Sequence, residues 1–383
     1  ILKQVITHRT TMNLSYWEYK SWLSNIDFTI VGSGIVGLNC ALHLKKQFPK
    51  AKILVLERGV LPQGASTKNA GFACFGSMSE VLSDLKQHSE EEVCQLVQKR
   101  WEGIQLLRET LGDHPMDYQN YGGGHEIFLK DQVHLYQDCL ENLNRVNTLL
   151  NPVFGRDAFL VHPNNFKFKG VHENYITNPF EGQINTGKMM KALVAKVQNS
   201  GVIILNAIAV DSYQENIDHV VVKTGQFEFK TNKLFIATNG FASQLIGESV
   251  KPARAQVLIT KPIENLSIKG TFHLDEGYYY FRNIDNRILL GGGRNLDFQG
   301  EETTTFGETT LIQNRLEEIL KTIILPNTPM GIDLRWSGIM GMGNQKKPIV
   351  KQLANNVYCG VRMGGMGIAI GSLVGKELAN LLK

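Results

Sequence analysis

The stretch that decides the fold is Phe28–Glu57, which reads FTIVGSGIVGLNCALHLKKQFPKAKILVLE. Two apolar runs bracket Gly32, Gly34 and Gly37, which stand in G-x-G-x-x-G spacing. This pattern predicts a buried strand, a tight turn, a helix that begins near Ile35 and a second buried strand. Such a unit presents unpaired N–H groups and the positive end of the helix dipole to phosphates, so it predicts a dinucleotide site.

Each glycine answers one demand of that ligand. Gly32 allows the tight turn, Gly34 has no side chain to hold the backbone away from a pyrophosphate, and Gly37 lets the helix pack close to the sheet. Glu57 ends the second strand and can accept hydrogen bonds from ribose hydroxyls. An acidic residue at this position argues against a 2′-phosphate.

Composition narrows the class of protein. Of the 383 residues, 43% are apolar and 20% are charged, which is ordinary for a globular protein of two moderate domains. The formal charge of +4 is spread without a basic run, so we expect no nucleic-acid partner. The five cysteines show no C-x-x-C spacing, which argues against a disulfide framework and a zinc cluster, and we expect no metal.

The sequence gives no sign of export or membrane insertion. No apolar stretch reaches the roughly 20 residues that span a bilayer. The first residues lack the charged, apolar and small-residue regions of a signal peptide. We therefore expect a cytoplasmic protein without a membrane span, and the oligomeric state stays open.

Helical and strand patterns alternate along the rest of the chain. Helices are expected at 80–111 in two parts, and at 132–150, 186–200 and 368–382. Strands are expected at 125–129, 202–205, 218–224, 226–230, 233–240, 255–260, 277–282, 287–290 and 356–359. Nucleotide-type signals at the front, middle and end, with strand-rich segments between them, predict a discontinuous nucleotide domain.

Four segments carry a family resemblance. They are the glycine motif, the loop Gly64–Gly71, the strand Leu234–Gly240 and the tail Gly360–Gly367. Together and in this order they resemble the D-amino acid oxidase-like family of FAD oxidoreductases. In local motifs the chain is similar to γ-glutamylputrescine oxidase, glycine oxidase and sarcosine oxidase.

The resemblance implies an α/β fold in two domains. A Rossmann-like FAD-binding domain with a parallel sheet would comprise residues 26–85, 170–245 and 335–383. A substrate domain on a mainly antiparallel sheet would comprise residues 86–169 and 246–334. The FAD would be noncovalent, because Lys68 stands where one branch has a tethering histidine and Gly341–Asn344 lacks the tethering cysteine of another.

The resemblance also assigns the cofactor contacts. They fall on the glycine turn, the end of the second strand, the loop after it, the middle strands and the tail. These residues are Gly32, Gly34, Gly37, Glu57, Arg58, Ala65, Ser66, Thr67, Lys68, Asn69, Ala70, Gly71, Ile208, Gly240, Gly364, Gly365, Met366 and Gly367. The tail glycines precede a helix whose N-terminus can stabilise negative charge on a flavin ring, and Met366 stands where the family often has histidine.

Both carboxylate anchors of the family are absent. Amino acid oxidases use an arginine where this chain has Met340, and sarcosine oxidases use a lysine where it has Ala369. Either another cation meets a carboxylate, with Arg282 as the first candidate, or the substrate is an amine without an adjacent carboxylate. The lysine that activates oxygen in sarcosine oxidases aligns with Leu289, which leaves Lys68 as the candidate cation for reaction with O₂.

An aromatic strand is expected to face the substrate. Tyr278, Tyr280 and Arg282 share one face of it, and Tyr279 and Phe281 share the other, so only one set can line the site. The candidate catalytic residues are Lys68, Tyr280, Arg282 and Met340.

The predicted function is oxidation of a C–N bond in a small amine or amino acid, by hydride transfer to noncovalent FAD and hydrolysis of the imine. Whether O₂ or another acceptor takes the electrons stays open. Two alternatives stay open as well. One is a FAD-dependent dehydrogenase of a hydroxy acid or polyol phosphate, and the other is a flavin-binding protein without turnover of its own.

Overall fold

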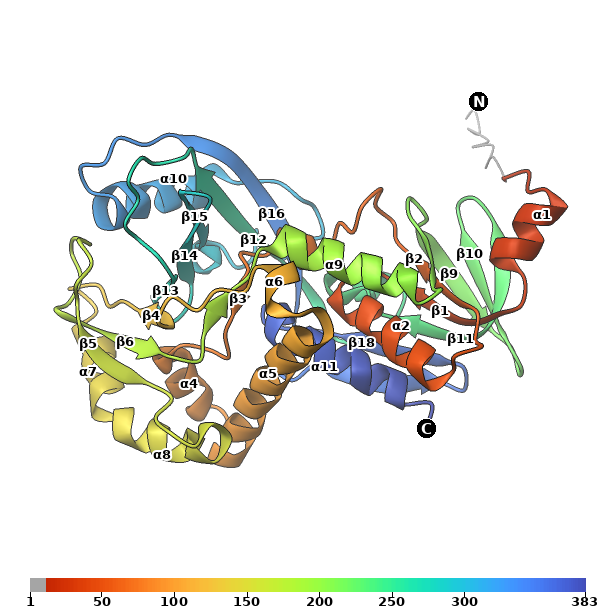
Figure 1. Ribbon diagram of the computed structural model, residues 1–383, viewed down its shortest axis with the longest axis horizontal. Helices are drawn as coiled ribbons and strands as arrows, with labels where there is room; N and C mark the ends of the chain where they lie inside the picture. Colours follow the sequence, from red (N-terminus) through yellow and green to blue (C-terminus); the bar gives the residue numbers. More distant parts are fainter. Residues whose placement is uncertain (1–11) are drawn as a thin grey trace, which may run out of the picture.

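Two large β-sheets organise the protein, one in each half of the molecule (Figure 1). The computed structural model describes residues 12–383. Residues 1–11, where a signal peptide would begin, lie outside the described residues. The first sheet is mainly parallel and the second is mainly antiparallel, so the expected two-domain α/β class is confirmed.

The first sheet has eight strands, and its central strands are parallel and buried. The parallel strands are β1 (Ile26–Val31), β2 (Ile53–Leu56), β8 (Ile203–Leu205), β11 (Glu228–Ile236) and β18 (Val357–Val361). The antiparallel strands are β9 (Val210–Glu215), β10 (Val220–Thr224) and β17 (Ile349–Ala354). The apolar runs of β2 and β18, and the nearly continuous burial of β1, suit strands that are covered on both faces.

Two layers of helices cover one side of this sheet. Helices α2 (Ile35–Gln47) and α11 (Gly367–Asn380) contact its strands, α5 (Glu90–Leu111) packs against α11, and α9 (Thr186–Asn199) packs against α2. In α2, a Cβ on Gly37 would collide with the carbonyl oxygen of Gly32, so only glycine fits. A Cβ on Gly375 of α11 would lie 2.6 Å from the carbonyl oxygen of Val36, which is why α2 and α11 can pack side by side (Figure 1).

The second sheet also has eight strands, and one pair in it, β13 with β4, is parallel. In spatial order the strands are β16 (Ile332–Met342), β12 (Lys251–Thr260), β15 (Arg287–Gly292), β14 (Tyr279–Ile284), β13 (Thr271–Leu274), β4 (Gly124–Glu126), β6 (Asn174–Asn178) and β5 (Leu160–Pro163). One apolar core lies between this sheet and α10 (Thr310–Ile319), where the rings of Phe272 and Phe281 stack with centroids 4.6 Å apart.

A separate apolar cluster forms under three helices. They are α4 (Met78–Leu85), α7 (Val133–Glu141) and α8 (Leu143–Phe154). The single helix expected at 132–150 is therefore two helices. The break falls at Asn142, whose side-chain amide donates to the carbonyl oxygen of Asp138 and so competes with helix continuation.

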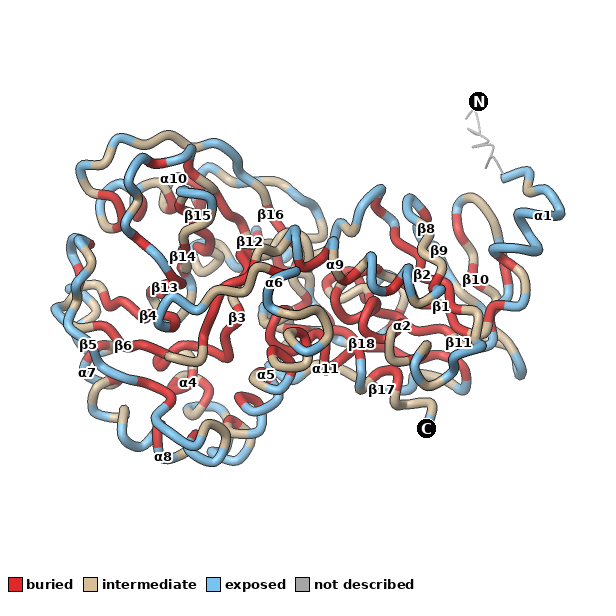
Figure 2. The backbone as a smooth tube through the Cα atoms, viewed as in Figure 1, coloured by how far each residue is buried: buried red, intermediate tan, exposed pale blue. Residues whose placement is uncertain are grey.

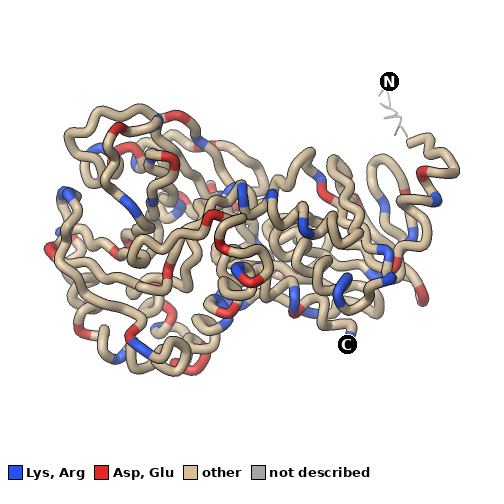
Figure 3. The backbone as a smooth tube through the Cα atoms, viewed as in Figure 1, with Lys and Arg blue, Asp and Glu red and all other residues tan. Residues whose placement is uncertain are grey.

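Short elements complete the described chain. They are α1 (Tyr16–Glu18), α3 (Ala65–Lys68), β3 (Phe72–Ala73), α6 (Asp113–Met116), β7 (Gly182–Gln183) and the irregular helical turns Tyr19–Leu23, Asn239–Gln244, Arg294–Leu296 and Leu320–Ile324. Figure 2 shows buried positions concentrated along the strands and the inner helices. Figure 3 shows acidic and basic positions interspersed along the chain. Among the described helices, none combines the length and the apolarity that a bilayer crossing needs.

Several of the longer elements were not predicted from the sequence. They are the helix α10 and the strands β5, β6, β9, β13, β16 and β17. Strand β6 pairs with β4 and β5 of the second sheet, whereas residues 170–245 were expected in the nucleotide domain. The assignment of the chain to two discontinuous domains stays a proposal.

Candidate functional site

A cavity of about 560 Å³ is lined by residues from both sheets. Val31 and Leu56 reach it from the first sheet, and Val257 and Tyr280 reach it from the second. The cavity includes the glycine turn after β1 at one end and the glycine-rich segment before α11 at another point of its wall. Segments that are more than 300 residues apart, Gly34 and Gly364, thus meet around one space.

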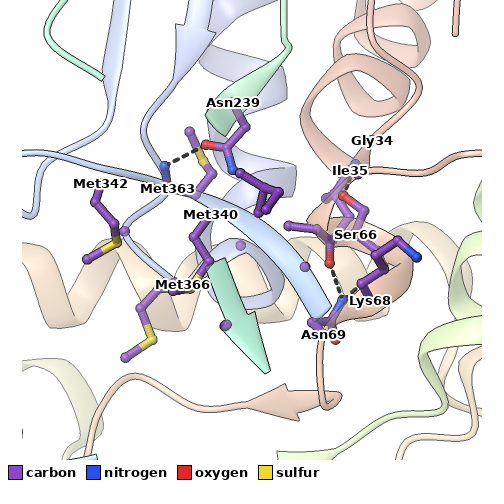
Figure 4. Close-up of a pocket in the computed structure, with 18 of the residues that line it drawn as sticks. Gly34, Ile35, Ser66, Lys68, Asn69, Asn239, Met340, Met342, Met363 and Met366 are labelled. Carbon is purple, nitrogen blue, oxygen red and sulfur yellow. Dashed lines mark hydrogen bonds between the residues drawn. The ribbon is translucent and has the colours of Figure 1, made fainter. Parts of the chain in front are cut away.

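The glycine turn forms a close cradle at the start of α2. Gly32 has φ +106, a conformation that suits glycine. A Cβ on Gly34 would lie 2.9 Å from the Oγ of Ser66, which accepts a 2.9 Å hydrogen bond from the backbone N–H of Ile35 (Figure 4). A side chain at Gly34 would therefore have to displace the hydroxyl of Ser66.

Glu57 is fixed beside this turn. One carboxylate oxygen accepts hydrogen bonds from the backbone N–H and the hydroxyl of Ser33, at 3.1 and 2.7 Å, and the other accepts from the N–H of Gly59 at 2.9 Å. Glu57 is 6% exposed and lines the cavity. The backbone N–H of Ile208 donates to the carbonyl oxygen of Glu57, which places Ile208 next to it in the cavity wall.

Arg58 lies flat against an aromatic ring beside Glu57. Its guanidinium carbon is 3.5 Å from the ring centroid of Phe241, and both residues line the cavity. This stacked pair offers a planar surface next to the expected ribose position.

The loop 64–71 folds into the short helix α3 and is held by its own side chains. Asn69 accepts from the N–H of Gly71 at 2.8 Å and donates to the carbonyl oxygen of Ser66 at 2.8 Å (Figure 4). Thr67 donates its hydroxyl to Pro62, away from the cavity. The cofactor candidates that line the cavity in this loop are Ala65, Ser66, Lys68, Asn69, Ala70 and Gly71.

The tail forms the opposite part of the wall. Gly364 and Gly365 have φ +58 and +84, and Gly367 begins α11. The backbone N–H of Met363 donates to the side chain of Asn239 at 3.1 Å, which ties the tail to the segment after β11. The thioethers of Met340, Met342, Met363 and Met366 surround this region (Figure 4).

Two cofactor candidates support the wall from behind. Gly37 packs against Gly32, as described above, and a Cβ on Gly240 would lie 2.6 Å from the carbonyl oxygen of Met340. Their role is therefore close packing of backbone against backbone.

The aromatic strand β14 turns one face to the cavity. Tyr278 and Tyr280 line it, whereas Tyr279 and Phe281 belong to the core under α10. Burial raises the pKa of Tyr280 to about 12, so its phenol is neutral at physiological pH.

Lys68 and Met340 also line the cavity, and Arg282 lies behind its wall. The Nζ of Lys68 is 5.0 Å from the ring centroid of Phe306. The guanidinium carbon of Arg282 is 3.2 Å from the position that a Cβ on Gly71 would take, and the residue is 2% exposed. Burial lowers the pKa of Arg282 to about 10, which still leaves it charged near pH 7.

Sequence reasoning gave no role to a buried pair of which one member, His273, lines the cavity. The Nε2 of His273 lies 2.8 Å from a carboxylate oxygen of Glu181, and both residues are at most 5% exposed. Burial lowers the pKa of His273, but the carboxylate of Glu181 outweighs it and raises the pKa to about 9. The pair was missed because β13 and the turn before β7 meet only in the folded chain.

Cys74 completes a cluster with this pair. The nearest donor atoms of Cys74, Glu181 and His273 lie within 4.8 Å of one another. Burial raises the pKa of the Cys74 thiol well above its usual value, and Glu181 already bonds to His273. Both properties oppose binding of a metal ion, because the thiolate is the form that binds metal.

The Glu181–His273 pair predicts a pH-dependent stability. The pKa of His273 is about 9 in the folded protein, against 6.5 in the unfolded chain. The pair therefore makes its full contribution to the free energy of unfolding below pH 6.5. That contribution, about 3 kcal/mol, is lost as pH rises through 9. Urea unfolding of the wild type should show this loss between pH 6.5 and 9.5.

Glu181→Gln is the matched variant for that prediction. Without the carboxylate, His273 loses the largest influence that raises its pKa, and only the weaker effects of Glu80 and Glu126 oppose burial, so stability should fall much less over this pH range. Parallel pH profiles for the wild type and Glu181→Gln would contradict the assignment.

Comparison with known proteins identifies the class. Residues 27–381 match the DAO family model, described as FAD dependent oxidoreductase. The chain belongs to this family.

Individual relatives are distant in sequence. Gamma-glutamylputrescine oxidoreductase of Escherichia coli (strain K12) is 22% identical over 380 residues, which cover 93% of this chain and 83% of that protein. Among solved structures, glycine oxidase from Geobacillus kaustophilus has a TM-score of 0.74 at 16% identity, covering 93% of this chain and 94% of that one. L-proline dehydrogenase from P. horikoshii has a TM-score of 0.73 at 17% identity, covering 94% and 93%. The two structural similarities show the fold alone.

Proposed function

We propose that this chain oxidises a C–N bond of an amine or amino acid with noncovalently bound FAD. The observation that carries the proposal is the single cavity that joins the glycine turn at Gly34 to the glycines before α11. A dinucleotide with a redox-active ring needs both features, one for its pyrophosphate and one for its ring.

The residues of the cavity fit FAD. The N-terminus of α2 and the bare backbone at Gly34 would hold the pyrophosphate, and Glu57 would accept hydrogen bonds from the ribose. The N-terminus of α11 at Gly367 would face the ring, where its positive dipole end favours the reduced, anionic form. Cys74 and Cys359 are both buried, and the flavin-tethering positions of relatives are here Lys68 and Gly341–Asn344, which supports noncovalent binding.

Bound FAD would supply a two-electron acceptor for the substrate C–N bond. The chain would hold the neutral amine against it in an apolar space. Val257, Tyr280, Met340 and Met366 line that space, and apolar side chains exclude water and so favour an uncharged amine. Lys68 is our candidate for promoting reaction with O₂, because it is the cation of the cofactor loop that lines the cavity.

The relatives support this substrate class. One is named for gamma-glutamylputrescine and another for glycine. The carboxylate anchors expected from the family are Met340 and Ala369 in this chain, so the position of any carboxylate differs here.

The proposal is tested by an anaerobic screen of the purified yellow protein. Amines, amino acids and hydroxy acids are added one at a time, and the loss of flavin absorbance is followed. Bleaching by an amine or amino acid, with release of ammonia or an amine on turnover, supports the proposal. Bleaching by hydroxy acids alone would favour the dehydrogenase alternative, and no bleaching by any compound would favour a flavin-binding protein without turnover.

Glycine and sarcosine should be poor substrates. An apolar side chain at Met340 cannot replace a bidentate contact to an α-carboxylate. Loss of such a contact costs about 1.5–3 kcal/mol, so we expect at least tenfold slower bleaching than with the best amine of the screen. Efficient turnover of glycine or sarcosine would contradict this description of the site.

A further inference from the structure

Arg100 is a buried cation in the cavity wall that sequence reasoning did not single out. It lies on α5, is 4% exposed and lines the same cavity as Met366 and Gly367. Helix α5 packs directly on α11: the hydroxyl of Ser372 donates to the carbonyl oxygen of Gly103, one turn after Arg100. The position of Arg100 is therefore fixed by the same packing that places the start of α11.

The guanidinium of Arg100 is only partly satisfied. Its Nη1 donates to the carbonyl oxygen of Phe75 at 2.8 Å, and its Nε has no hydrogen-bond partner. No carboxylate among residues 12–383 forms a salt bridge with it. The contrast is Arg254, which makes two hydrogen bonds to Glu301.

Two carboxylates near the Phe75–Gly76 turn form hydrogen bonds with other groups and none with Arg100. Glu181 bonds through Oε1 to His273, while its Oε2 has no partner, and Glu80 accepts from the backbone N–H of Ser77 at 2.9 Å, as the cap of α4. A buried guanidinium without a counter-ion is costly. Such a residue next to a cavity indicates that an anion binds there.

The cavity wall combines two kinds of side chain. Its apolar lining includes Val257, Tyr280, Met340 and Met366. Its polar lining includes, besides Arg100, Glu80 and Ser83 of α4, Gln87 after that helix and Lys346 before β17. A ligand that fills the cavity would therefore meet both apolar and charged side chains.

We propose that Arg100 binds a carboxylate of the substrate, so that the chain acts on amines that carry a carboxylate away from the reacting carbon. This inference rests on the proposed function and names its substrate class. Arg100 enters the cavity from α5 at the Phe75–Gly76 turn, and not from Met340 on β16 or Ala369 on α11. A carboxylate on Arg100 would therefore sit at a different place in the cavity from an α-carboxylate held at either of those positions, as a carboxylate separated from the reacting carbon by further carbon atoms would.

The first test measures binding without turnover. The purified protein is titrated with pentanoate and with pentanamide by calorimetry. The wild type should bind pentanoate more tightly than pentanamide. Arg100→Met should lower the affinity for pentanoate at least tenfold, because a charge-assisted hydrogen bond is lost. Arg100→Lys should keep part of the preference for pentanoate over pentanamide.

Lys99→Met is the matched control for charge. Lys99 is the neighbour of Arg100 on α5, but its ammonium is exposed and pairs with Glu377 at 3.0 Å. This variant should bind pentanoate as the wild type does. Equal pentanoate affinity in the wild type and Arg100→Met, with both proteins folded by thermal melting, would overturn the inference.

The second test compares matched substrates by anaerobic bleaching. The pairs are 4-aminobutanoate with butylamine and 5-aminopentanoate with pentylamine. In the wild type at least one carboxylated member should bleach the flavin tenfold faster than its partner, and Arg100→Met should reduce that ratio by tenfold or more. An unchanged ratio in Arg100→Met, or a wild type that prefers the plain amines, would overturn the inference.

The two tests separate this inference from the proposed function. If no amine bleaches the wild type, the proposed function fails, and the calorimetric comparison still decides whether Arg100 binds a carboxylate. If amines bleach it but the ratio does not depend on Arg100, the function stands and the inference fails.

Discussion

Gly34→Val should purify without flavin, as a colourless protein. Gly34 has φ −76, so valine meets no backbone strain there, and the chain should still fold. The Cβ would lie 2.9 Å from the Oγ of Ser66 and would fill the space where a pyrophosphate meets the N-terminus of α2. Bound FAD per chain, measured by absorbance after denaturation, should fall from about one to below detection.

Gly247→Val is the matched control. Gly247 is exposed, lies outside the cavity lining and has no atom within 4 Å of an added Cβ. This variant should keep its flavin, which excludes a general effect of replacing glycine by valine. A yellow Gly34→Val protein with stoichiometric FAD would refute the placement of the pyrophosphate.

The nucleotide half could be predicted from the sequence because its signals are local. The turn from Gly32 to Gly37 and the run that ends at Glu57 each belong to one short stretch. Local backbone requirements explain why these residues stand at this spacing. The confirmed class and the family followed from these stretches and from the tail glycines.

The strand β16 escaped prediction for a physical reason. Its first six residues, Ile332 to Ser337, alternate between apolar and polar, a strand signal that was overlooked, but Gly338 and Gly341 in its second half resemble a loop. The second half is a strand because β16 pairs along ten positions with β12, which lies about 80 residues earlier. Pairing of this glycine-containing half depends on tertiary contacts and leaves little trace in the sequence.

The polar groups of the cavity escaped for a related reason. His273 and Arg100 stand in no sequence motif. His273 is notable because it pairs with Glu181 in the folded chain, and Arg100 because its Nε has no hydrogen-bond partner there. Arg282 was favoured because it shares a strand face with Tyr280, yet Gly71 lies between it and the cavity. Strand periodicity shows which face a residue takes, but not how far along that face the cavity extends.

Glu301→Gln should destabilise the second half of the protein by about 3 kcal/mol. Glu301 has no exposed surface, and its carboxylate accepts from Arg254 at 2.7 and 2.9 Å and from Gln256 at 3.0 Å. Gln256 in turn accepts from the N–H of Thr309 at 2.9 Å. The network connects β12, which carries Val257 into the cavity, to the segment before α10. The variant therefore leaves the charge of Arg254 without its partner and weakens this connection.

Urea unfolding of the flavin-free protein measures this cost, and the adjacent residue supplies the control. Glu302 pairs with Lys251 at 3.2 Å on the surface, with the two side chains 47% and 56% exposed, so Glu302→Gln should cost less than about 1 kcal/mol. Replacing both partners, Arg254→Met with Glu301→Leu, should recover most of the loss, because removing a whole buried pair is cheaper than leaving one charge alone. If Glu301→Gln and Glu302→Gln have the same free energy of unfolding, water already screens Arg254. The carboxylate of Glu301 is then not what holds β12 in place.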